Sequence, residues 1–382
     1  MEPFKQLLHP GLVTRMAVHL QRAWPRFDAL RFEQLASRGL QVLELKARAL
    51  QIADALQVTL PGDFEHAARA LEAALAPPWP DDRLGSDDPC RDGLEGWALW
   101  PVGEYTARCG LADPQRALQL LHALTQRFSA EFAIRPFIVA HPDLTFAALQ
   151  RWSIDASAHV RRLASEGSRP RLPWGQRLQA LVQDPSPTLP LLRALQDDPS
   201  AYVRRSVANH LNDIAKDHPQ LVAQWLHEHL PDAPPARRAL LRHASRTLIK
   251  CGDPAVLKAW GLGQVLRGHA TLKLLPRRIE LGGALSMELQ LRSTSSRQQA
   301  LVIDYAVHHV KANGSSSAKV FKGWQVLLPP HGELKLVKRH SLRPVTTRRY
   351  HAGRHGLEVQ INGRVVAQSH FMLTLRQESG DD

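Results

Sequence analysis

One basic amphipathic helix occurs twice within residues 152–216, and this repetition limits the folds that the chain can adopt. The copies read ASAHVRRLASEG and PSAYVRRSVANHLNDIAK. Each begins at a serine, Ser157 or Ser200, that can cap a helix, and an arginine pair follows it. A third relative, PPARRALLRHASRTLIK, covers residues 234–250. Repeated helices of this kind predict a solenoid in which each unit packs on the next.

The spacing of the repeats favours degenerate HEAT-like repeats. The arginine pairs begin at Arg161, Arg204 and Arg237, with spacings of 43 and 33 residues. From Leu94 to about residue 260, short amphipathic segments alternate with proline dipeptides that suit the start of a helix. An irregular helical bundle is the alternative. The dipeptides are Asp113-Pro114, His141-Pro142, Asp184-Pro185, Asp198-Pro199, His218-Pro219 and Asp253-Pro254.

Helical periodicity also covers the N-terminal part of the chain. Residues 31–56 keep apolar residues at spacings of three and four, which predicts one long amphipathic helix. Pro61-Gly62-Asp63 ends it, and another helix starts there. Residues 78–93 are rich in Pro, Asp and Gly and have no periodicity, so they are expected to form a connection.

After Gly263 the periodicity changes to two, which is typical of β-strands. Six or seven such segments follow in about 110 residues, and Asn362-Gly363 is a hairpin signal. They are LSMELQLRS, QALVIDYAVHHV, FKGWQVLLP, GELKLVKRH, LEVQING and RVVAQSHFMLTL, and NGSSSAKVFKG is expected to contain a mobile loop.

The fold expected is therefore an α-helical HEAT-like repeat solenoid followed by an immunoglobulin-like β-sandwich. We place the helical domain, with a concave DNA-binding face, at residues 1–265 and the sandwich at 266–376. Residues 377–382 are expected to form a disordered tail.

The charge of the chain is concentrated in its last third. The net charge is +13 over 382 residues, and residues 266–382 contribute +10 of it, with 18 Lys and Arg against 8 Asp and Glu. This suits a polyanionic partner or an acidic membrane surface. A basic surface without a dedicated partner is the alternative.

The cysteines and the hydropathy favour a reducing compartment. Cys90, Cys109 and Cys251 are scattered, which fits neither a metal knuckle nor a redox pair. No stretch approaches the ~18 apolar residues of a membrane span, and the N-terminus lacks the layout of a signal peptide. We expect a cytoplasmic protein with no membrane partner.

Two acids occupy unusual positions in the repeated helices. Glu166 immediately precedes Gly167, a helix stop, and Asp213 lies in the last turn of the second copy. A carboxylate there meets the negative end of the helix dipole, at a cost of about 0.3–1 kcal/mol. An Arg162–Glu166 pair and an exposed Asp213 would explain both acids without a function. Their recurrence beside basic residues favours a function.

The segment Arg169-Pro170-Arg171-Leu172-Pro173-Trp174 has the composition of a stiff loop that contacts nucleic acid. Its arginines suit phosphates, and Trp174 can stack on a base or sugar. A connector whose tryptophan fills the core is the alternative. Arg205 lies on the polar face of the second copy, and Trp97 and Trp100 are expected in the core.

The densest basic run is 338–356, for which phosphate contact is the natural interpretation and a solvated strand and loop the alternative. Its candidate DNA-binding residues are Lys338, Arg339, Arg343, Arg348 and Arg349.

Other common chemistries have no motif in the chain. There is no Walker loop, HExxH, GxSxG or dinucleotide fingerprint. His141, His210 and His243 do not form a metal-ligand set. We expect neither a metal nor an organic cofactor.

Three segments between residues 128 and 217 are specific enough to resemble a known family. FSAEFAIRPF, HVRRLASEGSRPRLPW and DDPSAYVRRSVANHLNDIAKD resemble the DNA alkylation-repair glycosylases of the AlkC/AlkD superfamily, in particular the AlkC type. The segments RHSLRPVTTRRYHAGRH and LEVQINGR resemble the immunoglobulin-like extension of the AlkC type.

The resemblance implies a monofunctional base-excision-repair glycosylase. Its substrates would be N3-methylated bases, such as 3-methyladenine and 3-methylcytosine, in double-stranded DNA. It would hydrolyse the N-glycosidic bond with carboxylate assistance, without a cofactor or a lyase step, as a monomer in the bacterial cytoplasm or nucleoid. A non-catalytic DNA-binding or scaffolding repeat protein is the alternative.

The resemblance also implies the site residues. By motif, the catalytic acids fall on Glu131, Glu166 and Asp213, and the positions beside them on Arg162, Arg169, Arg171 and Trp174. Glu131 enters only through the resemblance, because its place after Ser129 at a predicted helix N-terminus explains it without a function. The working face is then expected to come from three helices. Which acid activates water stays open.

Overall fold

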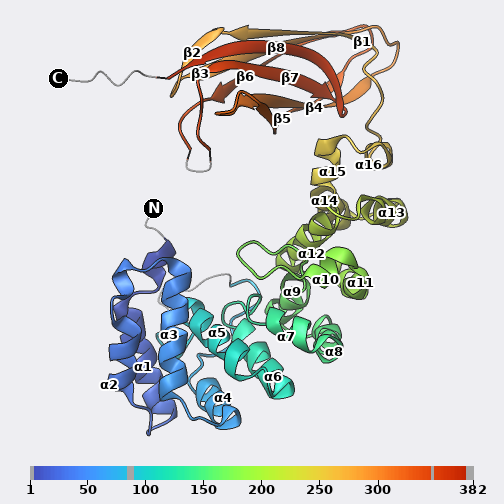
Figure 1. The fold of residues 1–382 in the computed structure, drawn as a ribbon. Coiled ribbons are helices and arrows are strands. Elements are labelled where there is room, and N and C mark those ends of the chain that lie inside the picture. The colour runs from blue at the N-terminus through green and yellow to red at the C-terminus, as the bar shows by residue number, and fades with distance from the viewer. Residues whose placement is uncertain (1–3, 84–89, 346–347, 376–382) are drawn as a thin grey trace, which may run out of the picture. The chain divides into compact units, whose positions relative to one another are not determined.

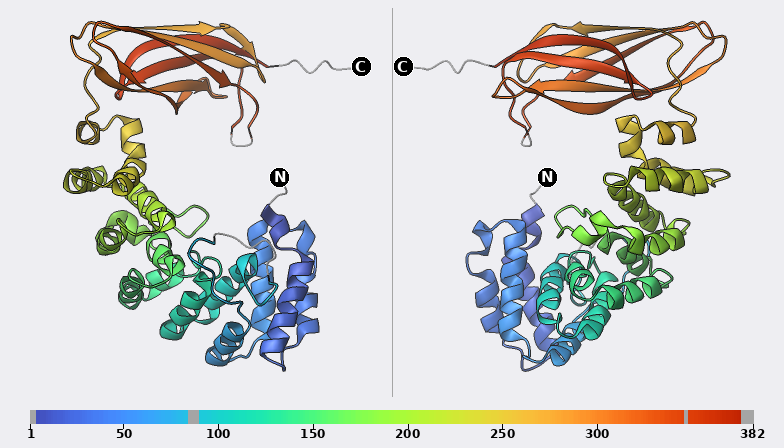
Figure 2. Two further views of the ribbon diagram at one scale, coloured as in Figure 1. Left: turned by 180° about the vertical axis from the view of Figure 1, so that it is seen from behind. Right: turned by 45° about the vertical axis from the view of Figure 1, so that its right-hand side comes forward.

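The structure is a computed structural model that describes residues 4–83, 90–345 and 348–375 (Figures 1 and 2). The chain divides into two compact units, Met1–His218 with Ala233–Ala244 and Pro219–Asp232 with Ser245–Asp382. The predicted tail 377–382, two residues of the basic run and part of the 78–93 connection lie outside the described residues. In the described ranges, no helix is long and apolar enough to cross a membrane.

The chain is helical as far as Ala259. Its helices are η1 (Phe4–Leu7), α1 (Pro10–Ala23), α2 (Ala29–Ser37), η2 (Leu40–Val42), α3 (Leu45–Thr59), α4 (Phe64–Ala73), η3 (Gly96–Ala98), α5 (Leu99–Cys109), α6 (Pro114–Thr125), α7 (Arg135–Ala140), α8 (Pro142–Trp152), α9 (Ala158–Gly167), α10 (Gln179–Gln183), η4 (Ser186–Thr188), α11 (Leu189–Leu195), α12 (Ala201–Ile214), α13 (Pro219–His229), α14 (Pro235–Ala244), α15 (Arg246–Cys251) and α16 (Pro254–Ala259).

Four of the six proline dipeptides mark helix starts as predicted, whereas η4 and α12 begin one and two residues after Pro185 and Pro199. Helices α6, α8, α13 and α16 begin at the prolines of their dipeptides. In α6 and α16 the preceding aspartate also caps the helix, since Asp113 accepts the amide of Arg116 and Asp253 accepts that of Val256.

Two predicted helices are each broken into separate pieces. The periodic run over residues 31–56 is divided between α2, η2 and α3, because Gly39 adopts a left-handed conformation with φ 65°. The third repeat copy is divided into α14 and α15 at Ser245. Periodicity continues across both breaks, so it does not reveal them.

Helices α9 and α12 start in the same way, although not by the predicted serine caps. Ser157 and Ser200 are the N-cap residues, but neither side chain caps its helix. Instead, the aspartate two residues earlier accepts the serine amide, at 2.8 Å in both copies. Arg161 and Arg204 each donate to two backbone carbonyls of the preceding turn. The repeat is therefore a repeat of contacts as well as of sequence.

The repeat helices stack in the first unit. Helix α9 packs on α12, and α12 packs on α14 (Figure 1). The predicted apolar faces are buried, with Val160, Leu163 and Ala164 on α9 and Val203 and Val207 on α12. The predicted helical-repeat architecture is confirmed, and α9 and α12 bring their C-terminal turns together.

The chain from Gly268 to Thr374 forms two sheets, which confirms the predicted sandwich (Figure 2). One sheet has the order β1-β3-β6 and the other β2-β8-β7-β4-β5. All pairs are antiparallel except β2 with β8. The strands are β1 (Gly268–Leu275), β2 (Arg278–Glu280), β3 (Ala284–Ser293), β4 (Gln299–Val310), β5 (Ser316–Leu328), β6 (Glu333–Ser341), β7 (Gly353–Ile361) and β8 (Arg364–Thr374).

The hairpin signal is confirmed and one loop prediction is wrong. Asn362 and Gly363 join β7 to β8 with φ values of 49° and 78°, as a tight hairpin requires. The segment expected to be a mobile loop instead starts β5 at Ser316, because β4 supplies a partner along its whole length. The strands β1 and β2 were not predicted.

Candidate active site

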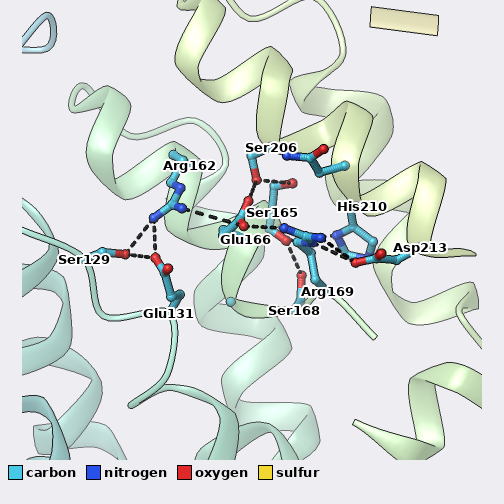
Figure 3. Close-up of polar contacts among 12 residues, drawn as sticks. Ser129, Glu131, Arg162, Ser165, Glu166, Ser168, Arg169, Ser206, His210 and Asp213 are labelled. Carbon is cyan, nitrogen blue, oxygen red and sulfur yellow. Dashed lines mark hydrogen bonds and ion pairs between the residues drawn. The ribbon is translucent and has the colours of Figure 1, made fainter. Parts of the chain in front are cut away.

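Three acids far apart in the sequence meet in the first unit (Figure 3). Glu166 is the next-to-last residue of α9, and Asp213 is the next-to-last residue of α12. Glu131 lies in the turn just before α7 rather than in a helix, so the site comes from two helices and a turn instead of three helices. The sequence placed both helical acids correctly at helix C-termini.

Arg162 of α9 joins Glu131 to Glu166. It donates from Nη1 to Glu131 Oε2 and to Ser129 Oγ, and its Nη2 lies 3.6 Å from Glu166 Oε1. The Ser129 hydroxyl also donates to Glu131 Oε2. The guanidinium carbon lies 5.2 Å from the centre of the Tyr202 ring, a cation–π contact.

Arg169, just after α9, joins Glu166 to Asp213. Its Nη1 donates to Glu166 Oε1 at 2.5 Å, and its Nε donates to Asp213 Oδ2 at 2.8 Å. Lys216 donates to Asp213 Oδ1 at 2.9 Å. The result is a continuous row of alternating charges, Glu131–Arg162–Glu166–Arg169–Asp213 (Figure 3), and Lys216 extends it.

Most of this row is buried. The side chains of Glu166 and Asp213 are 8% and 2% exposed, and that of Arg169 is 8% exposed. Asp213 is therefore not the ordinary exposed residue that its sequence position allowed. Glu166 has its shortest arginine contact with Arg169, so the Arg162–Glu166 pair alone does not account for it.

The arginines keep Glu166 ionised. Burial alone would raise its pKa, but the charges of Arg162 and Arg169 and the hydrogen bond from Ser206 outweigh that effect and hold the pKa below its usual value. Burial likewise opposes the charge of Arg169, yet Glu166 and Asp213 hold its pKa above the usual value. At neutral pH these groups are therefore charged.

The three carboxylates differ in how fully their oxygens are engaged. Both oxygens of Glu166 accept hydrogen bonds, Oε1 from Arg169 and Oε2 from Ser206 at 2.6 Å. Both oxygens of Asp213 are engaged by Arg169 and Lys216. Among the residues that the structure describes, no group donates to Glu131 Oε1, and this side chain is 16% exposed. Glu131 is thus the acid best able to accept a further hydrogen bond.

A pocket of about 360 Å³ opens beside the acids. Its lining combines the carboxylates of Glu131 and Glu166 with aromatic side chains and with residues of the loop after α9. Trp97 and Trp100, predicted as core residues, contribute to it; Trp100 is buried and also lines the pocket. The lining residues are Trp97, Trp100, Phe128, Ser129, Glu131, Phe132, Glu166, Arg169, Leu172, Pro173 and Trp174.

The predicted DNA-binding residues of the first unit lie in different surroundings. Trp174 is 71% exposed on the pocket rim, with φ 64°, so the alternative that it fills the core is wrong. Arg171 donates twice to Asp217 at 2.6 Å, and Arg205 is exposed on α12. Arg162 and Arg169 are engaged by the acids, so their contact with DNA stays a prediction.

The basic run of the second unit is largely on the surface. Lys338, on β6, donates to the carbonyls of Lys322 and Gly323, and Arg348 lies over the Tyr350 ring. The side chains of Arg339, Arg343 and Arg349 are exposed. Their role in DNA binding stays a prediction.

Ser206, which donates to Glu166, and His210, which bonds the backbone next to it, have no role at the site in the sequence-based prediction. Ser206 is seven residues before Asp213, so both lie on one face of α12, and that spacing was a usable signal. His210 hydrogen-bonds the carbonyl of Ser165 at 2.9 Å, and burial lowers its pKa to about 4, so it is neutral. No local pattern distinguishes His210 from a core histidine.

Comparisons with known proteins agree with this fold. Residues 268–375 match the family described as the C-terminal Ig-like domain of the uncharacterised protein YhaZ. The chain is 36% identical over 380 residues to the uncharacterised protein YhaZ of Bacillus subtilis strain 168, covering 98% of this chain and all of YhaZ. It is 35% identical to the alkylpurine DNA glycosylase AlkC of Pseudomonas fluorescens, solved bound to DNA with an abasic-site analogue. That match has a TM-score of 0.88 and covers 98% of this chain and 100% of the other.

Proposed function

This chain belongs to the AlkC family of alkylpurine DNA glycosylases, and we propose that it removes N3-methylated bases from double-stranded DNA. The substrates proposed are 3-methyladenine and 3-methylcytosine, and the reaction is hydrolysis of the N-glycosidic bond. The observation that carries the proposal is the row of three carboxylates joined by two arginines. Two of the carboxylates, those of Glu131 and Glu166, line a pocket with aromatic walls.

The charge of the substrate suits this arrangement. Methylation at N3 makes the base cationic, so it leaves as a neutral molecule and needs no acid to protonate it. As the glycosidic bond breaks, positive charge develops on the deoxyribose. A carboxylate fixed beside that sugar stabilises the charge and orients the attacking water.

Within the row, we assign the contact with the reacting centre to Glu131. Its Oε1 is the carboxylate oxygen that no described group engages, and its side chain lines the pocket. Glu166 and Asp213 are held on both oxygens, so their proposed role is to fix Arg169 and to set the local field. Trp174, exposed on the rim, is placed to stack on the sugar or a neighbouring base.

A lyase step is not part of the proposal. A Schiff base requires an amine at the sugar, and the described residues that line the pocket include no lysine. Lys216 donates to Asp213 and is not among the residues that line the pocket.

The positively charged surfaces are proposed to hold the flanking phosphates. In the first unit these are Arg171 and Arg205, and in the second the basic run from Lys338 to Arg349. Phosphate contacts position a protein on DNA without reading its sequence, which suits an enzyme that searches for rare lesions. We expect the chain to act as a monomer.

The test is release of methylated bases from alkylated DNA. We expect the wild type to release 3-methyladenine and 3-methylcytosine, and Glu131→Gln, Glu166→Gln and Asp213→Asn to slow the release. A DNA-binding scaffold would bind the same DNA without release. If the wild type releases no methylated base, or if none of the three substitutions slows release, the catalytic proposal is wrong.

A further inference from the structure

Arg135, the first residue of α7, is a buried cation that none of the described carboxylates contacts directly. Its side chain is 0% exposed. It donates from Nη1 to the carbonyl of Gly167 at 2.7 Å and from Nε to the carbonyl of Gln176 at 2.5 Å. Burial, followed by the charge of Arg169, lowers its pKa to about 10, so it is still protonated at neutral pH.

The two carbonyls that Arg135 binds are the two ends of one loop. Gly167 ends α9, and Gln176 lies shortly before α10. Between them stand Arg169, which links two of the acids, and Trp174 on the pocket rim. Because a guanidinium holds its donors in a rigid plane, one side chain fixes the distance between the two loop ends.

The loop has further bonds that close it on itself. The amide of Gly175 donates to Leu172, and the amide of Leu178 donates to Pro170, both at 3.2 Å. Trp174 has a φ of 64°, which an L-residue rarely adopts, so the surrounding contacts must hold it in place. Without Arg135, these loop bonds and the ion pairs of Arg169 and Arg171 remain, but the two ends of the loop lose the donor that they share.

The turn that carries Glu131 packs against Gly167, one of the two residues whose carbonyls Arg135 binds. Ile134 packs against the end of α9 so closely that a Cβ added to Gly167 would lie 2.6 Å from its Cγ2. Arg135 follows Ile134 directly. The turn of Glu131, the end of α9 with Glu166 and the loop of Arg169 are therefore joined around one guanidinium.

We propose that Arg135 is a positioning residue of the active site. It clamps the loop 168–176, so that Arg169 stays between Glu166 and Asp213 and Trp174 stays on the pocket rim. It does not touch the substrate. The catalytic part of this inference rests on the proposed glycosylase function.

A second buried arginine of the same unit shows what a purely structural arginine is like and supplies a control. Arg48 is 1% exposed and donates to four carbonyls, those of Lys5, Leu8, Gln41 and Leu43. Each of its nitrogens has a partner. In Arg135 the buried Nη2 has none among the described residues. A buried unsatisfied donor is destabilising, so stability alone does not explain why arginine stands at position 135.

Hydrogen exchange on the full-length protein tests the clamp without any substrate. A lysine has one ammonium and cannot hold both carbonyls in the geometry of a guanidinium. We expect Arg135→Lys to speed exchange of the amides of 169–178 by at least tenfold, with α12 unchanged. Arg48→Lys should leave 169–178 as in the wild type. If exchange in the loop is the same in Arg135→Lys and the wild type, the clamp is refuted.

Single-turnover kinetics tests the consequence for catalysis. We expect Arg135→Lys to slow base release by about 10²-fold, with the Kd for DNA containing an abasic analogue within threefold of wild type. Release by Arg135→Ala should recover in millimolar methylguanidinium and not in NaCl of equal ionic strength. Release by Arg135→Lys as fast as by Arg48→Lys would overturn the positioning role. If the wild type itself releases no base, the proposed function is wrong. The hydrogen-exchange experiment still shows in that case whether Arg135 holds the loop in place.

Discussion

Replacing Arg169 with leucine tests whether the arginines make the buried acids possible. Arg169 contacts Glu166 at 2.5 Å and Asp213 at 2.7 Å, and all three side chains are at most 8% exposed. At an effective dielectric constant of ~20, each contact is worth ~6 kcal/mol of Coulomb energy. The cost of burying the three charges offsets most of that gain. Removing the arginine leaves two buried carboxylates whose remaining cationic partners are Arg162, 3.6 Å from Glu166, and the 42% exposed Lys216 beside Asp213. We therefore expect the free energy of unfolding at pH 7 to fall by ~3–5 kcal/mol.

The pH dependence of this loss follows from the pKa of Glu166. In the wild type that pKa lies below its usual value, so the ionised acid stabilises the fold above pH ~4.5, and this stabilisation is lost as the pH falls through the folded-state pKa. In Arg169→Leu, burial and the neighbouring Asp213 should raise the pKa above its unfolded value. The variant then gains stability as the pH falls from 7 to 5, by up to ~1.4 kcal/mol per pH unit for each carboxylate.

Thermal unfolding at pH 7, 6 and 5, followed by helical circular dichroism, measures both effects. A unit of this size loses ~2–4 °C of Tm per kcal/mol, so we expect a decrease of ~6–20 °C at pH 7. Arg171→Leu is the matched control, because it breaks an ion pair with Asp217 whose side chains are 25% and 23% exposed; it should cost at most ~1 kcal/mol. The reasoning is refuted if Arg169→Leu melts no lower than Arg171→Leu, or if the difference from wild type does not shrink on acidification.

Three further predictions have defined outcomes. Glu131→Gln should slow base release by about 10²–10³-fold, while the Kd for abasic DNA and the Tm stay close to wild type because Arg162 retains Glu166 as an ion-pair partner. A parallel loss of DNA affinity would contradict the assignment of Glu131 to the reacting centre. Arg339→Ala and Arg349→Ala, at exposed positions of the second unit, should each reduce the magnitude of the slope of log K for DNA binding against log[salt] by ~0.9. Unchanged slopes would show that these arginines do not contact DNA phosphates. Burial lowers the pKa of His309 from 6.5 to about 3, so the neutral imidazole stabilises the second unit above pH 6.5, and this stabilisation is lost as the pH falls. Denaturant unfolding should show a lower free energy of unfolding at pH 5 than at pH 7, by a difference that is smaller in His309→Phe; an equal difference in that variant would contradict the prediction.

The sequence predicts most of the helix and strand arrangement because its signals are local. A proline at the first position of a helix acts on its own turn, so Pro114, Pro142 and Pro219 mark helix starts correctly. A break such as that at Gly39 needs a single left-handed residue, and the apolar periodicity continues across it. Local patterns therefore indicate which elements form more reliably than where they are interrupted.

The sequence predicts part of the acid cluster. The contacts that it does not predict join residues that are far apart in the chain. The positions of Glu166 and Asp213 mark them as candidates, because an acid at a helix C-terminus interacts unfavourably with the helix dipole. The compensating contact comes from Arg169, which lies 44 residues from Asp213 in sequence. The sequence predicts a phosphate contact for the same arginine, since it does not show which charge the arginine meets. Glu131 has no local signal at all, because its partner Arg162 is 31 residues away.

The proposed reaction determines which of these acids can accelerate it. The cationic base becomes neutral as the neutral sugar becomes cationic, so the total charge in the pocket does not change. A carboxylate equally distant from base and sugar attracts substrate and transition state alike, which improves binding without raising the rate of bond cleavage. Only an acid closer to the sugar stabilises the transition state more than the substrate. Glu166 and Asp213 already have their charges matched by Arg162, Arg169 and Lys216, so their effect on a moving charge is reduced. Glu131 is also paired with Arg162, but through Oε2; its Oε1, which no described group engages, is the oxygen that the developing charge can approach. The loss of rate should therefore be largest at Glu131, and the loss of stability largest at Asp213.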